Sequence, residues 1–174
     1  MLTAEKGKEI LRKDVLGVDI GGVIIDRVSD RTDTSFFGEN FLLTTAVPDA
    51  FEAIAMLAER RFPAGVYLVS KCGRKIEEKT LRWLDHHRFY EQTGVAEAHV
   101  RFCRERHEKA GICGELGITH FVDDRLEVLS DLTSVGKRYL FRPSEQELRR
   151  FARHLPSVTR VGSWKEIVED LLPA

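Results

Sequence analysis

The chain has 174 residues, of which 43% are hydrophobic and 32% are charged, and its formal net charge is −1. This composition is typical of a globular protein with a core and excludes a largely disordered chain. The absence of a basic excess argues against general nucleic-acid binding and against attachment to a membrane surface. A chain of this length predicts a single domain over residues 1–174.

Residues 1–13 are polar and charged and predict a lead-in segment to this domain. They lack the apolar run of a signal peptide, and no stretch of the sequence has transmembrane length. The three cysteines, Cys72, Cys103 and Cys113, are odd in number and form no CxxC pair. This usage is typical of reduced thiols, so we expect a cytoplasmic protein.

Apolar runs and apolar periodicity predict strands and helices that alternate along the chain. The first strand covers residues 15–20, and Pro48 begins a helix over 48–60. The remaining elements are strands at 65–70, 96–102, 119–124, 137–141 and 158–161, and helices at 74–87, 105–116, 125–132, 144–155 and 164–172. The last two helices begin with capping pairs, Ser144 with Glu147 and Ser163 with Glu166.

This alternation predicts an α/β fold in which right-handed crossovers join parallel strands. We expect a Rossmann-like three-layer sandwich, with a mostly parallel sheet of five or six strands and helices on both faces. Residues 26–47 show no clear period and predict a small flap or cap-like insertion after the first strand.

Polar side chains stand at the carboxyl ends of three predicted strands, where open parallel sheets bind their ligands. They are Asp19, Ser70 and the pair Asp123 and Asp124. Three acids at one edge repel each other strongly unless a cation lies among them. Hard oxygen ligands favour Mg2+, so the sequence predicts a Mg2+ site here.

These residues resemble the motifs of the haloacid-dehalogenase-like (HAD) superfamily. VLGVDIGGVII at residues 15–25 is similar to its first motif, a strand followed by Asp-x-Asp-Gly-Thr/Val. Leu-Val-Ser at 68–70 resembles the second motif. Lys109 followed by a strand that ends in Asp123 and Asp124 resembles the third and fourth. The motifs occur in the family's order, and the resemblance covers roughly residues 14–142.

The resemblance implies an Mg2+-dependent phosphohydrolase in which Asp19 is a nucleophile that forms an aspartyl-phosphate. Asp19 and the backbone carbonyl of Gly21 would bind the metal ion. Asp124 would complete the ligand set, with Asp123 binding directly or through water.

The resemblance also implies a phosphate site. Ser70 would donate a hydrogen bond to the transferring phosphoryl group. The backbone N–H groups of Ile20, Gly21 and Gly22 would surround the phosphate. Lys109 would neutralise charge on the phosphoryl group and on Asp19. Lys71 directly follows Ser70 and is the alternative lysine for the phosphate.

The sequence departs from the family pattern at Gly21. Most family phosphatases carry an aspartate there, which protonates the leaving group and then activates water. Glycine cannot transfer protons, and general acid–base catalysis contributes about 10²–10⁴-fold to the rate. Two readings therefore stay open: a phosphohydrolase whose acid comes from Asp26, a loop or the substrate, and a binding or regulatory module that keeps the metal and phosphate site without turnover.

A third reading compares VDIGG at residues 18–22 with the first phosphate motif of the hexokinase and actin group. That fold needs two such domains, and the reading leaves Asp123 and Asp124 unexplained, so we disfavour it.

The sequence leaves no room for a large cap domain. We therefore expect an open site that takes a phosphorylated substrate, bulky ones included, or that a partner subunit closes in a homo-oligomer. The aromatic and apolar residues Phe36, Phe37, Phe41 and Leu42 would form the flap or an oligomer contact.

Overall fold

The structure is a computed structural model that describes residues 13–27 and 35–174. Residues 1–12 of the predicted lead-in and 28–34 of the predicted insertion lie outside the described residues. Six strands form one sheet in which every neighbouring pair is parallel, in the order β3-β2-β1-β4-β5-β6. Their bounds are β1 Leu16–Val18, β2 Val66–Lys71, β3 Val100–Cys103, β4 His120–Asp123, β5 Lys137–Phe141 and β6 Thr159–Val161.

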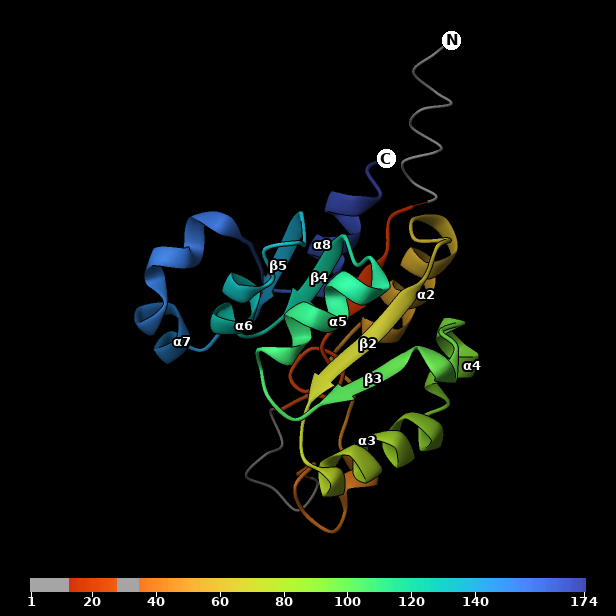
Figure 1. The fold of residues 1–174 in the computed structure, drawn as a ribbon. Helices are drawn as coiled ribbons and strands as arrows, with labels where there is room; N and C mark the ends of the chain where they lie inside the picture. Colours follow the sequence, from red (N-terminus) through yellow and green to blue (C-terminus); the bar gives the residue numbers. More distant parts are fainter. Residues whose placement is uncertain (1–12, 28–34) are drawn as a thin grey trace.

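Helices cover both faces of this sheet (Figure 1). Neighbouring residues of a strand point to opposite faces, so Val122 belongs to one hydrophobic cluster and Phe121 to the other. The first cluster includes buried residues of α2 (Ala50–Arg60), α3 (Arg74–His86), α4 (Phe89–Thr93) and α8 (Trp164–Leu171). The second includes residues of α5 (Glu108–Leu116), α6 (Leu126–Asp131) and α7 (Glu145–Arg150). The predicted three-layer α/β fold is therefore confirmed.

Glycine is required at one position inside the sheet. A Cβ at Gly17 in β1 would lie 2.4 Å from the ring of Phe121 in the neighbouring β4. The missing side chain lets this aromatic ring pack against the backbone of β1, which keeps the two central strands in close register.

Several predicted boundaries differ from the structure. The strand predicted at 96–102 begins only at Val100, because Glu97–His99 form a 3-10 turn. The helix predicted at 144–155 ends at Arg150, and a 3-10 segment, Ala152–Ser157, follows it. The short helix α4 was not predicted. It begins after Arg88, whose positive φ of 55° ends the preceding helix and reverses the chain.

The predicted capping residues act at both helix starts. The Ser144 hydroxyl accepts the N–H of Glu147, and the Ser163 hydroxyl accepts the N–H of Glu166. Within the part of the chain that the structure describes, none of the helices combines the length and the apolar character needed to cross a membrane.

The described residues of the predicted insertion pack largely on the core. Phe36 and Phe41 are buried and meet edge to face, next to a 3-10 turn at Phe41–Leu43. The buried indole of Trp83 donates to the carbonyl of Thr44 at 2.9 Å and ties this segment to α3. Phe37 is the exception, with 61% of its surface exposed.

Candidate active site

The acidic residues predicted to meet do come together at the carboxyl edge of the sheet. Val18 pairs with Leu68 of β2 on one side and with Val122 of β4 on the other, so Asp19 and Asp123 follow at the same level, and β2 continues past it through Ser70 to Lys71. One carboxylate oxygen from each of Asp19, Asp123 and Asp124 lies within 4.8 Å of the others. Sheet register alone therefore produces the cluster.

A pocket of about 310 Å3 opens at this edge. Its polar floor includes Asp19, Ser70, Lys109 and Asp123, and Lys71 lies at its margin. Apolar side chains of the insertion and of α3, such as Phe37 and Ile76, line one wall. The predicted catalytic residues and both candidate lysines thus share a single concave surface. Ser70 is buried and Lys71 is exposed.

Lys109 lies between two of the carboxylates and is 2% exposed. Its Nζ donates to Asp19 Oδ1 at 2.9 Å and to Asp123 Oδ2 at 2.8 Å. Burial by itself lowers the pKa of Lys109, but attraction to Asp123 and Asp19 raises it above its ordinary value. Lys109 is therefore a fixed positive charge beside Asp19, and not a proton donor at neutral pH.

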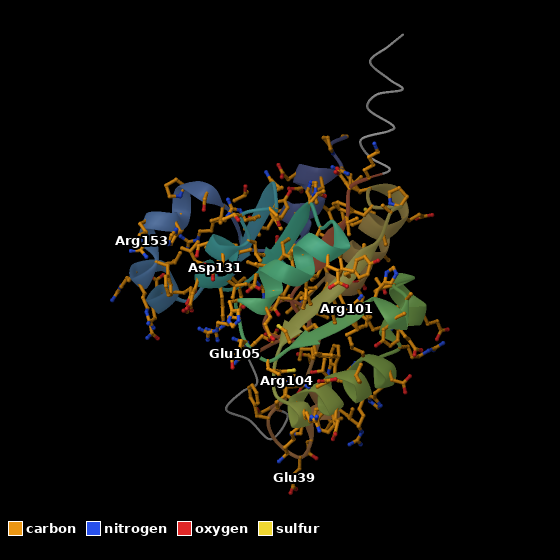
Figure 2. All side chains as sticks on the ribbon, viewed as in Figure 1. Glu39, Arg101, Arg104, Glu105, Asp131 and Arg153 are labelled. Carbon is orange, nitrogen blue, oxygen red and sulfur yellow. The ribbon has the colours of Figure 1, made fainter. Side chains whose placement is uncertain are left out.

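The loop before α5 places Lys109 at this edge. Arg104 and Glu105 lie on the loop that joins β3 to α5 (Figure 2). The carboxylate of Glu108 accepts the backbone N–H of Arg104 at 2.8 Å and that of Glu105 at 2.7 Å. This cap fixes the start of α5, so the next residue points into the pocket.

Asp19 and Asp123 differ in their surroundings. Burial raises the pKa of Asp19, and the negative charge of Asp123 adds to that effect, against the attraction of Lys109. The backbone N–H of Ile20 also donates to Asp19. In Asp123 both oxygens have protein partners, because Oδ2 accepts from Lys109 and Oδ1 accepts the N–H of Arg125 at 2.9 Å. Both carboxylates line the pocket.

The charge of Asp124 is only partly compensated by its neighbours. Its Oδ1 is buried and has no hydrogen-bond partner among the described residues. Its Oδ2 lies 3.3 Å from Nη1 of Arg27, a side chain that is 44% exposed. Burial, together with the charges of Asp19 and Asp123, raises the pKa of Asp124 to about 7. An exposed partner compensates little for a buried charge, so this cluster fits a bound cation.

The loop after β1 folds back on itself. The carbonyl of Ile20 accepts the N–H groups of Val23, Ile24 and Ile25, and the N–H of Gly22 donates to the carbonyl of Ile25 at 2.9 Å. The buried indole of Trp164 donates to the carbonyl of Val23 at 2.9 Å and anchors the loop to α8.

The folded loop leaves the three predicted phosphate-binding amides in different situations. The N–H groups of Ile20 and Gly22 already have partners within the chain. Gly21 itself lies at the pocket wall. Phosphate binding by the amides of Ile20, Gly21 and Gly22 stays a prediction.

Arg27 was missed by reasoning from the sequence. It follows the first strand in an irregular segment, and its contact with Asp124 exists only because the loop folds back. The charge of Arg27 was visible in the sequence, but no periodicity or spacing linked it to residues almost a hundred positions away.

Comparison with solved structures finds a HAD family hydrolase from Deinococcus radiodurans R1, crystallised with bound phosphate and sodium. The TM-score is 0.61, the sequences are 14% identical, and the match covers 94% of this chain and 99% of that chain. No protein-family model and no curated protein sequence matches the chain. The structural match shows that the chain has the HAD-like fold predicted from its strand-end residues.

Proposed function

We propose that this HAD-like chain is an Mg2+-dependent phosphohydrolase that acts through an aspartyl-phosphate on Asp19. One observation carries the proposal: Lys109 bridges Asp19 and Asp123 inside the pocket, while the adjacent Asp124 keeps a buried oxygen that has no partner among the residues the structure describes. Metal and phosphate chemistry accounts for this combination, because a divalent cation would contact the oxygen of Asp124 that no described residue reaches.

The donor set fits a hard divalent cation. Asp19, Asp124 and the carbonyl of Gly21 would hold it, with Asp123 bound directly or through water. The ion pairs of the cluster join three carboxylates to the two cations Lys109 and Arg27, which leaves one negative charge that a divalent ion would offset. When bound, the ion would supply charge stabilisation to the phosphoryl oxygens. The phosphate and sodium held by the Deinococcus hydrolase support a site for an anion and a cation in this fold.

Residues of the chain would carry out the remaining catalytic roles. Asp19 attacks phosphorus with a carboxylate oxygen and forms the phosphoenzyme. Lys109 favours the ionised form of Asp19 and attracts the phosphoryl oxygens, and the Ser70 hydroxyl donates to one of them. Lys71 lies at the same pocket and is a further cation available to the substrate.

A second function is favoured by a specific residue, Gly21. Without an acid at this position the same site could bind a phosphorylated partner, or hold a phosphoryl group on Asp19, without turnover. This regulatory module would share the fold, the cation and the pocket with the phosphohydrolase, and it would differ only in the rate of phosphate release.

The substrate that we propose is a phosphorylated compound, bulky ones included, because the chain has no room for a large cap domain. The three cysteines are unpaired, which supports the proposed cytoplasmic location. Assembly into a homo-oligomer stays a prediction that sedimentation of the purified protein can check.

Phosphate release from p-nitrophenyl phosphate tests the proposal. The wild-type protein should release phosphate only with Mg2+, and Asp19→Asn should lose the activity. Asp131→Asn is a matched control, because Asp131 is an exposed carboxylate that does not line the pocket. Equal background rates for wild type and Asp19→Asn across a panel of phosphate esters would favour the regulatory module.

A further inference from the structure

The guanidinium of Arg27 fills the space in front of two consecutive glycines. A Cβ at Gly21 would lie 3.1 Å from Nη2 of Arg27, and a Cβ at Gly22 would lie 2.7 Å from Oδ2 of Asp124 and 3.3 Å from Nε of Arg27. Gly22 also has a positive φ of 78°, which a side chain rarely adopts. Arg27 therefore lies where a side chain at position 21 would begin, and it lines the same pocket as Asp19 and Lys109.

The exchange of an acidic side chain for an arginine at this place changes the chemistry that is available. A carboxylic acid can give a proton to a departing oxygen. A guanidinium stays protonated at all relevant pH values and offers only charge and N–H donors. A group of this kind stabilises an oxygen that leaves as an anion, but it cannot convert a poor leaving group into a neutral alcohol.

We propose that Arg27 contacts the leaving-group oxygen and makes the enzyme specific for phosphate compounds whose leaving groups depart as stable anions. Aryl phosphates, acyl phosphates and phosphoric anhydrides belong to this class, and simple alkyl phosphates do not. This inference rests on the proposed function, because it concerns the first step of the same reaction.

The step balances without a proton donor. A carboxylate oxygen of Asp19 forms a bond to phosphorus while the bond from phosphorus to the leaving oxygen breaks. The electron pair leaves with that oxygen, which pairs with Arg27 and takes its proton from water after release. Water then attacks phosphorus, the bond to Asp19 breaks, and inorganic phosphate and the free carboxylate are formed.

Arg27 is free enough to make this contact. Its side chain is 44% exposed, and its ion pair with Asp124 is long, at 3.3 Å. Exposed pairs of this kind contribute little energy, so a developing negative charge in the pocket can compete for the guanidinium. The ion pair with Asp124, which the leaving-group oxygen would displace from Arg27, is therefore weak.

Asp26 is the competing candidate for this place. It lines the pocket, and its backbone N–H donates to the carbonyl of Thr45 at 2.9 Å, which fixes its position. If Asp26 protonated the leaving group, the rate would depend little on the leaving group's own acidity. The two residues thus predict opposite behaviour in one kinetic experiment.

A series of substituted phenyl phosphates, extended by an alkyl phosphate, tests the inference in the presence of Mg2+. For the wild type, kcat/KM should fall steeply as the pKa of the departing alcohol rises. The alkyl phosphate should be slower by at least the roughly 10²–10⁴-fold that a general acid would have contributed. Arg27→Met should lower kcat/KM by about 10²-fold for the poorer phenols, with a smaller loss for the best ones, and Arg27→Lys should recover part of that loss.

Arg106→Met is the matched control, because Arg106 also lines the pocket but pairs with Glu127 at 2.6 Å. It should not change the slope of the series. A flat wild-type series that Asp26→Asn makes steep would overturn the inference in favour of Asp26. A loss in Arg27→Met that is equal for all leaving groups would also overturn it. Absence of turnover with every substrate would instead contradict the proposed function, and this inference with it.

Discussion

Charged side chains are paired differently at the two ends of the central strands. At the amino end, Asp14 and Arg61 form a pair at 2.7 Å, each side chain 14% exposed, so one acid meets one base. The hydroxyl of Thr119 there exchanges hydrogen bonds with both backbone groups of Val15. At the carboxyl end, Asp19 and Asp123 share the buried cation Lys109, and Asp124 pairs with the partly exposed Arg27. The first arrangement pairs one acid with one base, although one Arg61 nitrogen has no partner among the described residues, whereas the second has one more carboxylate than paired cations, which is the charge imbalance that our proposed cation would offset.

Lys109→Met should show the largest effect at the carboxyl end. Loss of the buried ammonium leaves Asp19 and Asp123 without their shared partner, so we expect the free energy of unfolding to fall by about 3–5 kcal/mol. Urea denaturation measures this change. In the double variant with Asp123→Asn, most of the stability should return while activity stays lost. A Lys109→Met protein as stable as the wild type would show that the buried charges need no partner.

Mg2+ should stabilise the protein by binding at the carboxyl end of the central strands and not at the amino end. At about 100 times its Kd, the ion should raise the free energy of unfolding by about 2.7 kcal/mol. Asp124→Asn should remove this gain, because it converts the unpaired carboxylate to an amide. The Tm in Mg2+ and in EDTA measures the effect for both proteins. An equal Mg2+ gain in both would place the ion elsewhere.

Asp14→Asn at the amino end should destabilise the fold by about 1–3 kcal/mol, because Arg61 loses its partner in a largely buried place. The kcat/KM of the folded fraction and the gain from Mg2+ should not change. Thermal denaturation and the phosphatase assay, run on the same preparation, separate the two quantities. A loss of kcat/KM at full folding would mean that the two ends are coupled.

The pH dependence of stability should reveal the raised pKa of Asp124. The folded pKa of Asp124, about 7, lies above its ordinary value of 3.8. The folded state therefore favours the protonated form, and this stability is present at low pH and is lost as the pH rises from about 4 to 7. Denaturation in EDTA at pH 5 and pH 8 should show a larger loss for the wild type than for Asp124→Asn. An equal loss in both would contradict the raised pKa.

The sequence predicted the site residues that lie at strand ends, because the register of parallel strands is enough to bring these residues together. Apolar runs that end in Asp19, Ser70 and Asp123 identify strands, and parallel strands bring their ends to one edge of a sheet. Lys109 came from a family resemblance, since nothing in its own helix distinguishes it from other lysines. The alternating fold and most helices were predicted for the same reason as the strands: their apolar patterns are local and periodic.

The remaining features depend on contacts that have no local signal. Arg27 reaches Asp124 through a loop held by the carbonyl of Ile20, and such loop geometry leaves no period in the sequence. The helix at Phe89–Thr93 is too short to show an apolar stripe. Phe36 and Phe41 lie in a segment that the sequence marked as irregular, yet both pack on the core, because burial does not require regular secondary structure.

A covalent phosphoryl group on Asp19 tests the central claim most directly. The protein is mixed with Mg2+ and p-nitrophenyl phosphate, quenched in acid within the first turnovers, and analysed by intact mass and peptide mapping. We predict one phosphoryl group, located on Asp19, that accumulates because position 21 offers no base to activate water. It should be absent in EDTA and in Asp19→Asn. Steady phosphate release with no phosphoryl group on Asp19 at any time point, or full turnover by Asp19→Asn, would contradict the account.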